Sequence, residues 1–548
     1  MLRKKYVVNF AGFTLAFTDD MGYNGAGWSA FRGFVRSRLR GMIMDRNLLA
    51  IFLTAFIAGG VVRAQGEPDL QKSAASMEKA LVKIIEKNEP VIACILVSRS
   101  DLYEEFGQGP DKEKAGVLGT FDIRQFEEHP RIRGESSKEK RLHFLKLLDF
   151  THPGYVPRSF GSGVVIDAKG LVLTNYHVVQ DATKIYVRLP GTRGSYADIH
   201  AADPRSDLAV LKLRDAALLP LPTIQLGDAD KLQRGSFVLT LANPYAAGYR
   251  DGKPSASYGI ISNIRRRSLT HLKEEERVKP LHYYATLLQT DARLHLGCSG
   301  GALLNLSGEL VGLITSVAAI QGFETPGGFA IPLNAGMRRI IDVLKRGEEV
   351  DFGFLGVGFD ERNSNGKPGV QLTLVGEGSP ADVDGRLKRG DLLLAVNGHP
   401  IHDSDDIYTT IGVHLAGAKV KLQVQRLANV HDVEVTLAKL LVPGKKIASS
   451  LGNRPFVHGM RVDYTSLIAQ KPSGSLQIPR GVMISELRSA TLAERAGLKL
   501  GDVVTHVNGT LVATPAHFYD AMAKTTGAIE LTMYNFPPID PPTKIQLK

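Results

Sequence analysis

Two hydrophobic periods divide this chain of 548 residues into segments of different structure. Between positions 66 and 88, apolar residues recur at the spacing of one helix face until Asn88-Glu89-Pro90 breaks the pattern. Those apolar residues are Leu70, Met77, Leu81, Ile84 and Ile85. Residues 91–97 then predict a first strand, and from 161 to 333 short β-branched runs alternate with Gly, Asp and Pro. This second pattern is typical of two packed β-barrels. A short helix is predicted at 335–346, at the end of the barrel region.

Two stretches do not follow the strand pattern and are predicted to be insertions. Residues 99–157 are highly charged and show no strand alternation until Phe160. They form either a solvated surface loop or a regulatory loop that contacts the active site or another subunit. Residues 245–284 contain charge runs at 265–267 and 273–277, which we interpret as a solvated face.

The C-terminal part of the chain contains an internal repeat. Residues 378–382 and 389–398 match residues 489–493 and 500–509. Both copies carry Gly-Asp, then an apolar run, then Val-Asn-Gly. We therefore expect two copies of one small domain, at 350–440 and 452–540, after a hinge around residues 346–349.

The N-terminal segment has the features of a secretory signal. An apolar run at 48–62 follows Arg46 and ends at Val62-Arg63-Ala64. The run is short for a membrane span, which needs about 20 apolar residues. We expect a signal peptide at 44–64, translation from Met42 or Met44, and an extension at 1–43 that precedes the true start. The alternative is a cytoplasmic tail followed by an uncleaved membrane anchor.

Composition limits the class of protein. The chain is 43% hydrophobic and 22% charged, as in soluble globular proteins, and its length predicts roughly three to four domains. Residues 1–64 supply +6 of the net charge of +11, so the rest does not indicate nucleic-acid binding. Cys94 and Cys298 are too few for a disulfide framework. His271, His282 and His295 do not share metal-ligand spacing with nearby acids, so we expect no metal and no cofactor.

Three motifs point to nucleophilic catalysis. Ser299 lies in Gly297-Cys298-Ser299-Gly300-Gly301, a tight glycine loop, and a serine hydroxyl needs an adjacent base to attack. His177 follows an apolar run, and Asp207 begins another. The order His, Asp, Ser is that of the chymotrypsin-like double barrel.

The same motifs, with three others, carry a specific resemblance. In chain order they are 161–167, 174–179, 207–213, 289–292, 297–304 and 328–332. Together they resemble the HtrA (Deg, DegP-like) family of trypsin-like periplasmic serine proteases, over roughly residues 70 to 540. The resemblance implies a mainly β fold, with a chymotrypsin-like double β-barrel protease domain at 65–347 followed by two PDZ domains.

The resemblance assigns roles to individual residues. Ser299 is the expected nucleophile, His177 the base and Asp207 the residue that orients it. The oxyanion hole is expected from the backbone of Gly297, Cys298 and Ser299, with the N–H groups of Gly297 and Ser299 as donors.

Further residues are expected to bind substrate. Thr315 is expected to hydrogen-bond the aspartate, and Thr315, Ser316 and Val317 to pair with the substrate as a strand. Phe329, Ala330 and Ile331 are expected to wall the specificity pocket. No acidic residue is evident at the base of that pocket, which favours small aliphatic side chains before the scissile bond.

Each PDZ repeat offers a candidate peptide-binding loop. PDZ domains add an extended peptide to a sheet edge and capture its terminal carboxylate with backbone N–H groups. In the first repeat the loop is Phe354, Leu355, Gly356 and Val357, and apolar C-terminal peptides are the expected ligands. In the second repeat, residues 459–462 are the weaker candidate, because Arg461 replaces an expected glycine.

The nucleophile loop departs from the family pattern. The family usually has Asn-Pro-Gly-Asn before the serine, whereas this chain has His295-Leu296-Gly297-Cys298. Without the proline, the loop has more freedom in the unfolded state, so we expect low basal activity that a ligand raises. Cys298 is either a small side chain that fills the place of the asparagine or a redox- or alkylation-sensitive switch.

The sequence therefore predicts an ATP-independent serine endopeptidase that degrades unfolded or damaged envelope proteins in protein quality control. PDZ domains would recruit substrates and regulate the protease, and the resemblance implies a trimer-based homo-oligomer. The protein is expected to be periplasmic or secreted, or membrane-anchored if the N-terminal segment is uncleaved. The alternative is a catalytically weak or inactive PDZ scaffold or chaperone on the same fold.

Overall fold

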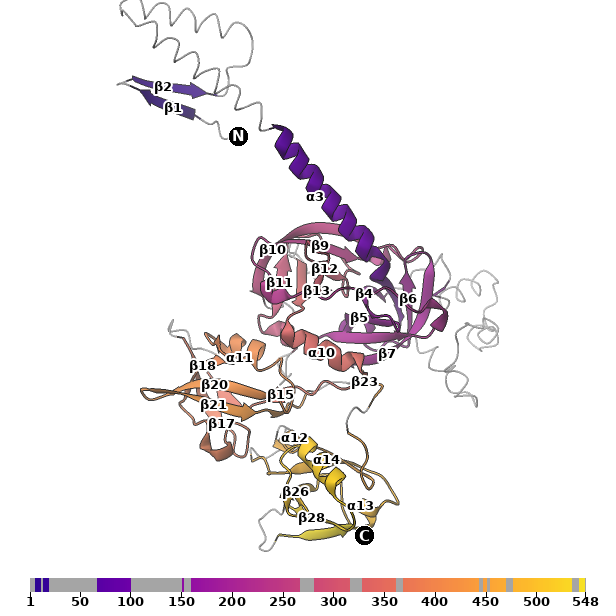
Figure 1. The fold of residues 1–548 in the computed structure, drawn as a ribbon, viewed down its shortest axis with the longest axis vertical. Coiled ribbons are helices and arrows are strands. Elements are labelled where there is room, and N and C mark those ends of the chain that lie inside the picture. Colours follow the sequence, from indigo (N-terminus) through magenta and orange to yellow (C-terminus); the bar gives the residue numbers. More distant parts are fainter. Residues whose placement is uncertain are drawn as a thin grey trace, which may run out of the picture. The chain divides into compact units, whose positions relative to one another are not determined.

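The computed structural model describes twelve parts of the chain (Figure 1). They are residues 5–10, 13–18, 67–99, 150–151, 159–266, 280–315, 328–360, 368–442, 447–450, 454–469, 477–534 and 542–547. The predicted signal peptide at 44–64 and nearly all of the predicted insertion at 99–157 lie outside these residues. Among the helices that are described, none has the length and apolar character needed to cross a membrane.

The chain divides into two compact units, residues 1–79 and 80–548. The first unit contains an antiparallel hairpin of β1 (Lys5–Phe10) and β2 (Phe13–Thr18), paired from Lys5 with Thr18 to Phe10 with Phe13. Helix α3 (Glu67–Asn88) follows, which confirms the helix predicted at 66–88. The Asn88 side chain donates to the carbonyl of Ile84 (2.9 Å), and Pro90 lies in the 3₁₀ turn that follows.

The first barrel of the second unit closes through a pairing of β7 with β8. Its strand order is β7-β6-β3-β4-β5-β8. The strands are β3 (Ile92–Ser98), β4 (Ser159–Asp167), β5 (Leu171–Asn175), β6 (Lys184–Leu189), β7 (Arg193–Asp203) and β8 (Leu208–Leu213). The strand predicted at 91–97 is thus confirmed. Most side chains of β3, β5 and β8 are buried, because these strands are built almost entirely of apolar residues.

The second barrel is closed in the order β10-β11-β14-β13-β12-β9, so the chymotrypsin-like double barrel is confirmed. Its strands are β9 (Phe237–Ala242), β10 (Ser255–Arg266), β11 (Leu287–Thr290), β12 (Ala302–Leu304), β13 (Leu310–Thr315) and β14 (Gly328–Pro332). Strand β10 corrects one prediction, since residues 245–284 are not wholly an insertion. Only Ile261 of β10 is fully buried, and the polar residues on the rest of the strand hid the pattern in the sequence.

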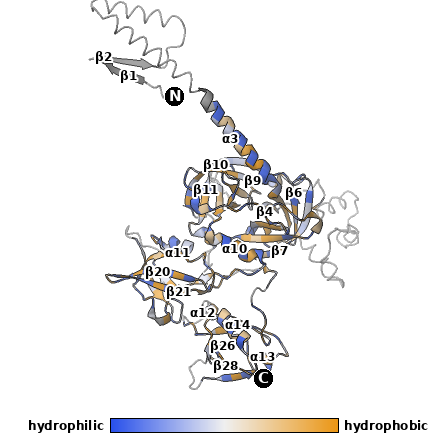
Figure 2. Cartoon of the chain, in the orientation of Figure 1, coloured by the Kyte–Doolittle hydropathy of each residue, from blue (hydrophilic) through white to orange (hydrophobic). Residues whose placement is uncertain are grey.

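Helix α10 (Ala335–Lys345) confirms the closing helix predicted at 335–346. The Asn334 side chain caps it by accepting a hydrogen bond from the N–H of Met337 (3.0 Å). Its apolar residues are buried in the large core cluster, and hydrophobic and hydrophilic residues mix along its length in Figure 2. Because the helix is amphipathic, it covers apolar surface of the barrels on one side and faces solvent on the other.

The two C-terminal repeats have the same topology, which confirms the internal repeat. The first sheet runs β16 (Val357–Phe359), β17 (Val370–Val375), β18 (Leu392–Val396), β20 (Lys419–Arg426) and β21 (Asn429–Thr436), with helix α11 (Ser404–Thr410). The second runs β24 (Met460–Tyr464), β25 (Val482–Leu487), β26 (Val503–Val507), β28 (Ile529–Met533) and β29 (Lys544–Leu547), with helix α14 (Pro515–Lys524). Each repeat has its own hydrophobic core.

The repeated sequence signature is explained by two local structures. Asn397-Gly398 and Asn508-Gly509 all have positive φ, as the tight turn of a two-residue hairpin requires. The aspartate of each Gly-Asp pair, Asp391 or Asp502, accepts a hydrogen bond from the backbone three residues upstream (2.8 Å in both). The shared residues therefore fix the two ends of the same strand in each repeat.

The segment between the repeats adds a strand to the first barrel. Strand β23 (Ile447–Ala448) pairs with β7, with Ile447 opposite Ala202. Beyond it, the Ser449 hydroxyl lies 2.8 Å from Nδ1 of His200. The connection between the repeats is thus part of a protease-domain sheet.

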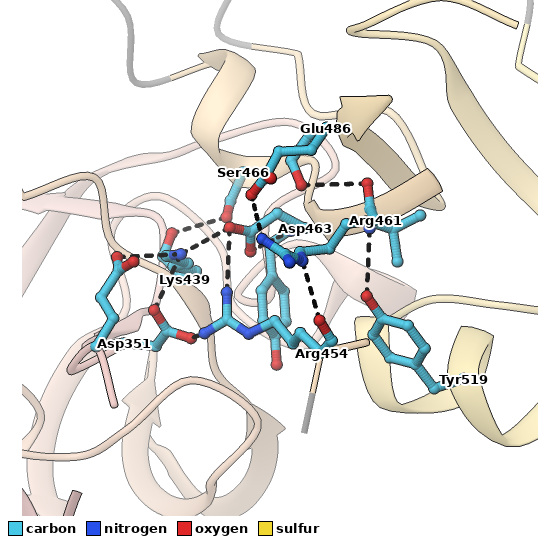
Figure 3. A network of polar contacts seen from close by, with 12 residues as sticks. Asp351, Lys439, Arg454, Arg461, Asp463, Ser466, Glu486 and Tyr519 are labelled. Carbon is cyan, nitrogen blue, oxygen red and sulfur yellow. Dashed lines mark hydrogen bonds and ion pairs between the residues drawn. The ribbon is translucent and has the colours of Figure 1, made fainter. Parts of the chain in front are cut away.

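A buried ionic cluster joins the two repeats (Figure 3). Lys439 of β22 (Ala438–Lys439) places Nζ 2.6 Å from Asp463 of β24 and 2.9 Å from Asp351. Arg454 pairs with the same two carboxylates. Lys439 is buried, so its charge depends on these partners for stabilisation.

Candidate active site

Asp207 lies on the connection between β7 and β8, with a left-handed backbone (φ 55°). Its carbonyl accepts hydrogen bonds from the Tyr176 N–H (3.0 Å) and from the Asn175 side chain (3.2 Å). Just before it, the Asp203 carboxylate accepts from both the N–H and the hydroxyl of Ser206. These bonds attach the aspartate loop to the end of β5, from which the short helix α9 (Tyr176–Val179) begins.

His177 and Asp207 form a direct pair. Nδ1 of the imidazole lies 3.0 Å from Oδ1 and 2.8 Å from Oδ2 of the carboxylate, and the His177 N–H donates to Oδ1 (3.0 Å). The Thr315 hydroxyl donates to Oδ2 (3.4 Å). An ionised carboxylate only accepts hydrogen bonds, so Nδ1 carries the proton and Nε2 keeps its lone pair.

Burial and charge act in opposite directions on this pair. Burial alone would raise the pKa of Asp207, but the charge and hydrogen bonds of His177 hold that pKa below the ordinary value of a carboxyl group. Burial likewise opposes protonation of His177, yet Asp207 raises its pKa above the ordinary value. The His177 side chain is 41% exposed and that of Asp207 only 7%. Of the two side chains in this pair, only the imidazole is therefore accessible to a substrate.

The Ser299 loop is held against the first barrel through Ser162 of β4. The Ser162 N–H donates to the Ser299 carbonyl (2.7 Å), and its hydroxyl donates to the Gly297 carbonyl (2.7 Å). From β5, the Thr174 hydroxyl donates to the Ser162 carbonyl (2.7 Å). Strands β4 and β5 therefore link the serine loop of one barrel to the histidine of the other.

The residues before Ser299 form a type II turn. The Cys298 N–H donates to the His295 carbonyl (3.0 Å), and Gly297 has φ 96°, the left-handed value that such a turn needs at its third position. The Leu296 carbonyl accepts from the Tyr245 N–H (2.7 Å). In a trans peptide the next N–H points the opposite way, so the Gly297 N–H faces away from Tyr245.

Space also requires a glycine at position 297. A Cβ there would lie 2.6 Å from the Asn243 carbonyl oxygen and 2.9 Å from the Phe160 ring. Cys298 is buried, its Sγ accepts a 3.4 Å hydrogen bond from the His295 N–H, and burial raises the pKa of its thiol. The loop thus takes a defined turn without the family's proline.

Comparison with known proteins places this geometry in a family. A trypsin-like peptidase domain matches residues 161–313, and a PDZ domain matches residues 353–437. A Pseudomonas putida (strain W619) protein named "Probable periplasmic serine endoprotease DegP-like" is 30% identical over 489 residues, 86% of this chain and 92% of the relative. This chain belongs to the DegP-like serine endoproteases. A relative of the same name from Ectopseudomonas mendocina (strain ymp) is 34% identical over 372 residues, 66% of this chain and 74% of its own length.

The DegP-like chain is accordingly a serine endopeptidase with a trypsin-like peptidase domain. Among solved structures, the HtrA-type protease AlgW with tripeptide is 23% identical, with a TM-score of 0.45. That match covers 66% of this chain and 98% of the AlgW chain.

The expected specificity residues of this DegP-like protease are only partly brought together. Ser316 and Val317 lie outside the described residues. On β14, Phe329 and Ile331 pack in one core cluster and Ala330 packs in another. Successive strand residues point to opposite faces, so Phe329, Ala330 and Ile331 do not line one pocket together.

Sequence reasoning missed two residues that organise the site. Ser162 lies in the motif at 161–167, but nothing in that motif indicates a contact with a residue 135 positions away. Asn243 donates from its side chain to the Ala93 carbonyl (2.9 Å) and accepts from the Gly248 N–H (3.1 Å). Such side chain to backbone bonds between barrels have no periodic signal in a sequence.

The peptide loops of the two repeats differ. In the first, the Leu355 and Gly356 carbonyls accept bonds from Ala381 (3.1 Å) and Gly376 (2.9 Å). Strand β16 pairs with β17 on one side only among the described strands. These two bonds fix the Leu355 and Gly356 carbonyls of the loop to the residues that follow β17.

In the second repeat, backbone N–H groups of the corresponding loop and strand are hydrogen-bonded to residues of the same repeat. The Met460 N–H donates to the Val457 carbonyl (3.0 Å) across a turn in which His458 and Gly459 both have positive φ. The Val462 N–H on β24 points to the Tyr519 hydroxyl of α14 (3.4 Å; Figure 3). Arg461 stacks over the Phe456 ring at 4.2 Å. Loop and strand edge are thus already hydrogen-bonded.

Proposed function

We propose that this endopeptidase degrades unfolded or damaged polypeptides of the bacterial envelope, with Ser299 as nucleophile, His177 as general base and Asp207 as the group that orients it. The observation that carries the proposal is the His177–Asp207 pair, 2.8 Å at its shortest, bound through β4 and β5 to the Ser299 loop. Relatives named periplasmic endoproteases support the compartment.

Each step of the reaction uses groups of this chain. Nε2 of His177 takes the Ser299 proton as Oγ attacks the scissile carbonyl, and Asp207 stabilises the imidazolium that forms. The N–H groups of Gly297 and Ser299 donate to the oxyanion, which a type II turn before the serine supports. His177 then protonates the leaving amine, and water releases the acyl group by the same route. No step needs ATP or a cofactor.

Substrate capture is assigned to the first repeat. Its loop at Phe354 to Val357 would hold the carboxylate of an apolar C-terminus, with the chain added to β16. The second repeat, whose Met460 and Val462 N–H groups are engaged internally, would not bind such a peptide. Assembly into a trimer-based homo-oligomer remains part of the proposal.

Active-site labelling tests the assignment directly. A fluorophosphonate should label the wild-type protein at Ser299, and Ser299→Ala and His177→Ala should abolish both labelling and casein cleavage. Equal casein cleavage by wild-type protein and Ser299→Ala would overturn the assignment. Absence of labelling and cleavage in wild-type protein, with peptide binding retained, would favour the inactive scaffold.

A further inference from the structure

The guanidinium of Arg99 is bound to the short helix that carries His177. Arg99 follows the last residue of β3, and its side chain donates from Nε to the Gln180 carbonyl (2.7 Å). From Nη2 it donates to the carbonyls of Val178 (3.1 Å) and His177 (3.4 Å). Helix α9 ends at Val179, and the carbonyls at the end of a helix have no intrahelical partners. One arginine therefore holds three of the four carbonyls from 177 to 180.

The first barrel fixes Arg99 from the opposite side. Its Nη1 donates to the Ser159 hydroxyl (2.6 Å), and Ser159 begins β4 opposite Val97 of β3. The preceding carbonyl, that of Ser98, accepts from both the N–H (2.9 Å) and the hydroxyl (3.2 Å) of Thr183. The Arg99 side chain thus connects the paired strands β3 and β4 to helix α9, with hydrogen-bond acceptors on both sides.

His177 is therefore held through its backbone as well as through its ring. Asp207 binds Nδ1 of the ring and the His177 N–H, whereas Arg99 binds the carbonyl of the same residue. A general base must lie within about 2.6–3.2 Å of the hydroxyl whose proton it takes, so a small rotation of α9 would impair proton transfer from Ser299. None of the six motifs that carry the family resemblance contains Arg99. Arg99 thus adds a constraint on the base that those motifs do not supply.

Three charged or titratable groups surround His177. Burial and the positive charge of Arg99 both lower the pKa of the imidazole, and the charge and hydrogen bond of Asp207 outweigh them. His282 is the third group, and burial lowers its pKa below the ordinary value, so it is neutral near pH 7. Arg99 is thus the positive charge among the three, and its loss should raise the pKa of His177.

We propose that Arg99 is a positioning residue for His177, which it holds through the carbonyls at the end of α9 in the orientation that accepts the Ser299 proton. This inference rests on the proposed function, because it assumes that His177 is the base. Arg99 acts through the backbone of α9, so its replacement should change kcat and leave KM unchanged. Because Arg99 is exposed, the replacement also leaves the barrel core intact.

Two substitutions separate the geometry of Arg99 from its charge. Arg99→Gln removes the charge, and Arg99→Lys keeps it but replaces the planar fork by a single ammonium group. We expect both to lower kcat about tenfold, a part of the about 10²–10⁴-fold that a positioned base supplies. The value is taken per active site, counted by complete fluorophosphonate labelling. The midpoint of the labelling rate against pH should rise in Arg99→Gln and keep its wild-type value in Arg99→Lys.

Arg193→Gln and Arg193→Lys are the matched controls. Arg193 is also an exposed arginine of the first barrel, and its Nε also donates to a backbone carbonyl, that of Pro190 (3.2 Å). Both control variants should keep the wild-type kcat, KM and pH midpoint.

Wild-type kcat in Arg99→Gln would overturn the inference, and so would wild-type kcat in Arg99→Lys, since charge alone would then suffice. A raised KM at unchanged kcat would overturn it by placing Arg99 against the substrate. Fewer labelled sites with wild-type kcat per site would show a role in folding only, and would also overturn it. In all these cases Ser299 still reacts and the proposed function stands. Absence of both labelling and cleavage in wild-type protein would instead refute the proposed function.

Discussion

The Ser162 hydroxyl of the first barrel donates a 2.7 Å hydrogen bond to the Gly297 carbonyl of the second. The same hydroxyl accepts from the Asn243 N–H (2.8 Å), and all three groups are enclosed between the barrels. The orientation of the Gly297 peptide in the second barrel therefore depends on Ser162 of the first barrel.

Ser162→Ala should impair both folding and catalysis. The change leaves two buried backbone groups unsatisfied, at about 1–3 kcal/mol each, and frees the Gly297 peptide to move. Because one lost oxyanion donor costs about 10²–10³ in rate, we expect kcat to fall at least tenfold. Steady-state kinetics would measure this, with the exposed Ser307→Ala as a control that keeps wild-type kcat. A wild-type kcat in Ser162→Ala would show that the bond does not position the turn.

Asp207→Asn should lower kcat by about 10⁴-fold, because an amide can donate to Nδ1 and so favours the wrong tautomer. The pH profile gives a second readout. His177 must be neutral to act as base, and Asp207 raises its pKa, so activity should rise with pH through a midpoint above about 6.5. The fluorophosphonate labelling rate from pH 5 to 9 would measure the midpoint, and removal of Asp207 should shift it downward. A midpoint unchanged by Asp207→Asn would contradict the pairing.

Lys439→Met should destabilise the repeats. The change leaves Asp351 and Asp463 facing each other with only Arg454 to compensate them. Removal of one partner from a buried ion cluster typically costs about 3–5 kcal/mol. Thermal unfolding of the Ser299→Ala protein would show this as a lower Tm. Lys419→Met, which breaks an exposed pair with Glu434, should have little effect. Equal Tm values for the two variants would argue that the cluster contributes no net stability.

Peptide binding should have a stoichiometry of one per chain. Calorimetry of the Ser299→Ala protein with an apolar C-terminal peptide would measure it. Gly356→Ala should abolish binding, because its Cβ would lie 2.2 Å from Cβ of Ser379 at φ 85°. Gly459→Ala, equally crowded against Thr491, should leave binding unchanged. Two sites per chain would contradict the closed second loop.

The Cys298 side chain should only fill space in the nucleophile loop and should not react. It is buried, and burial raises its thiol pKa, so little reactive thiolate forms near neutral pH. We expect iodoacetamide to leave the activity of the native protein unchanged, and Cys298→Ala to retain most of it. Rapid inactivation by iodoacetamide that Cys298→Ala prevents would establish the alkylation-sensitive alternative.

Local sequence patterns predict an element correctly where the interactions that form it are also local in the sequence. The helix at 66–88, the strand at 91–97 and the helix at 335–346 follow from periodicity and from breakers such as Pro90. The Asn-Gly turns revealed the repeat, because few residues tolerate positive φ. Strand β10 was missed, since only Ile261 is fully buried and the other positions follow no inside-outside alternation.

For the proposed active site, the motifs predict the residue types and their order along the chain, His177, Asp207 and Ser299. The tertiary structure decided how they are held, through Ser162, Asn243 and the Tyr245–Leu296 bond. It also decided that the second repeat closes on itself through Tyr519. These contacts join segments far apart in the chain by single hydrogen bonds. The energy of each hydrogen bond depends on how the donor and acceptor lie in three dimensions. The spacing of residues along the chain carries no information on that geometry.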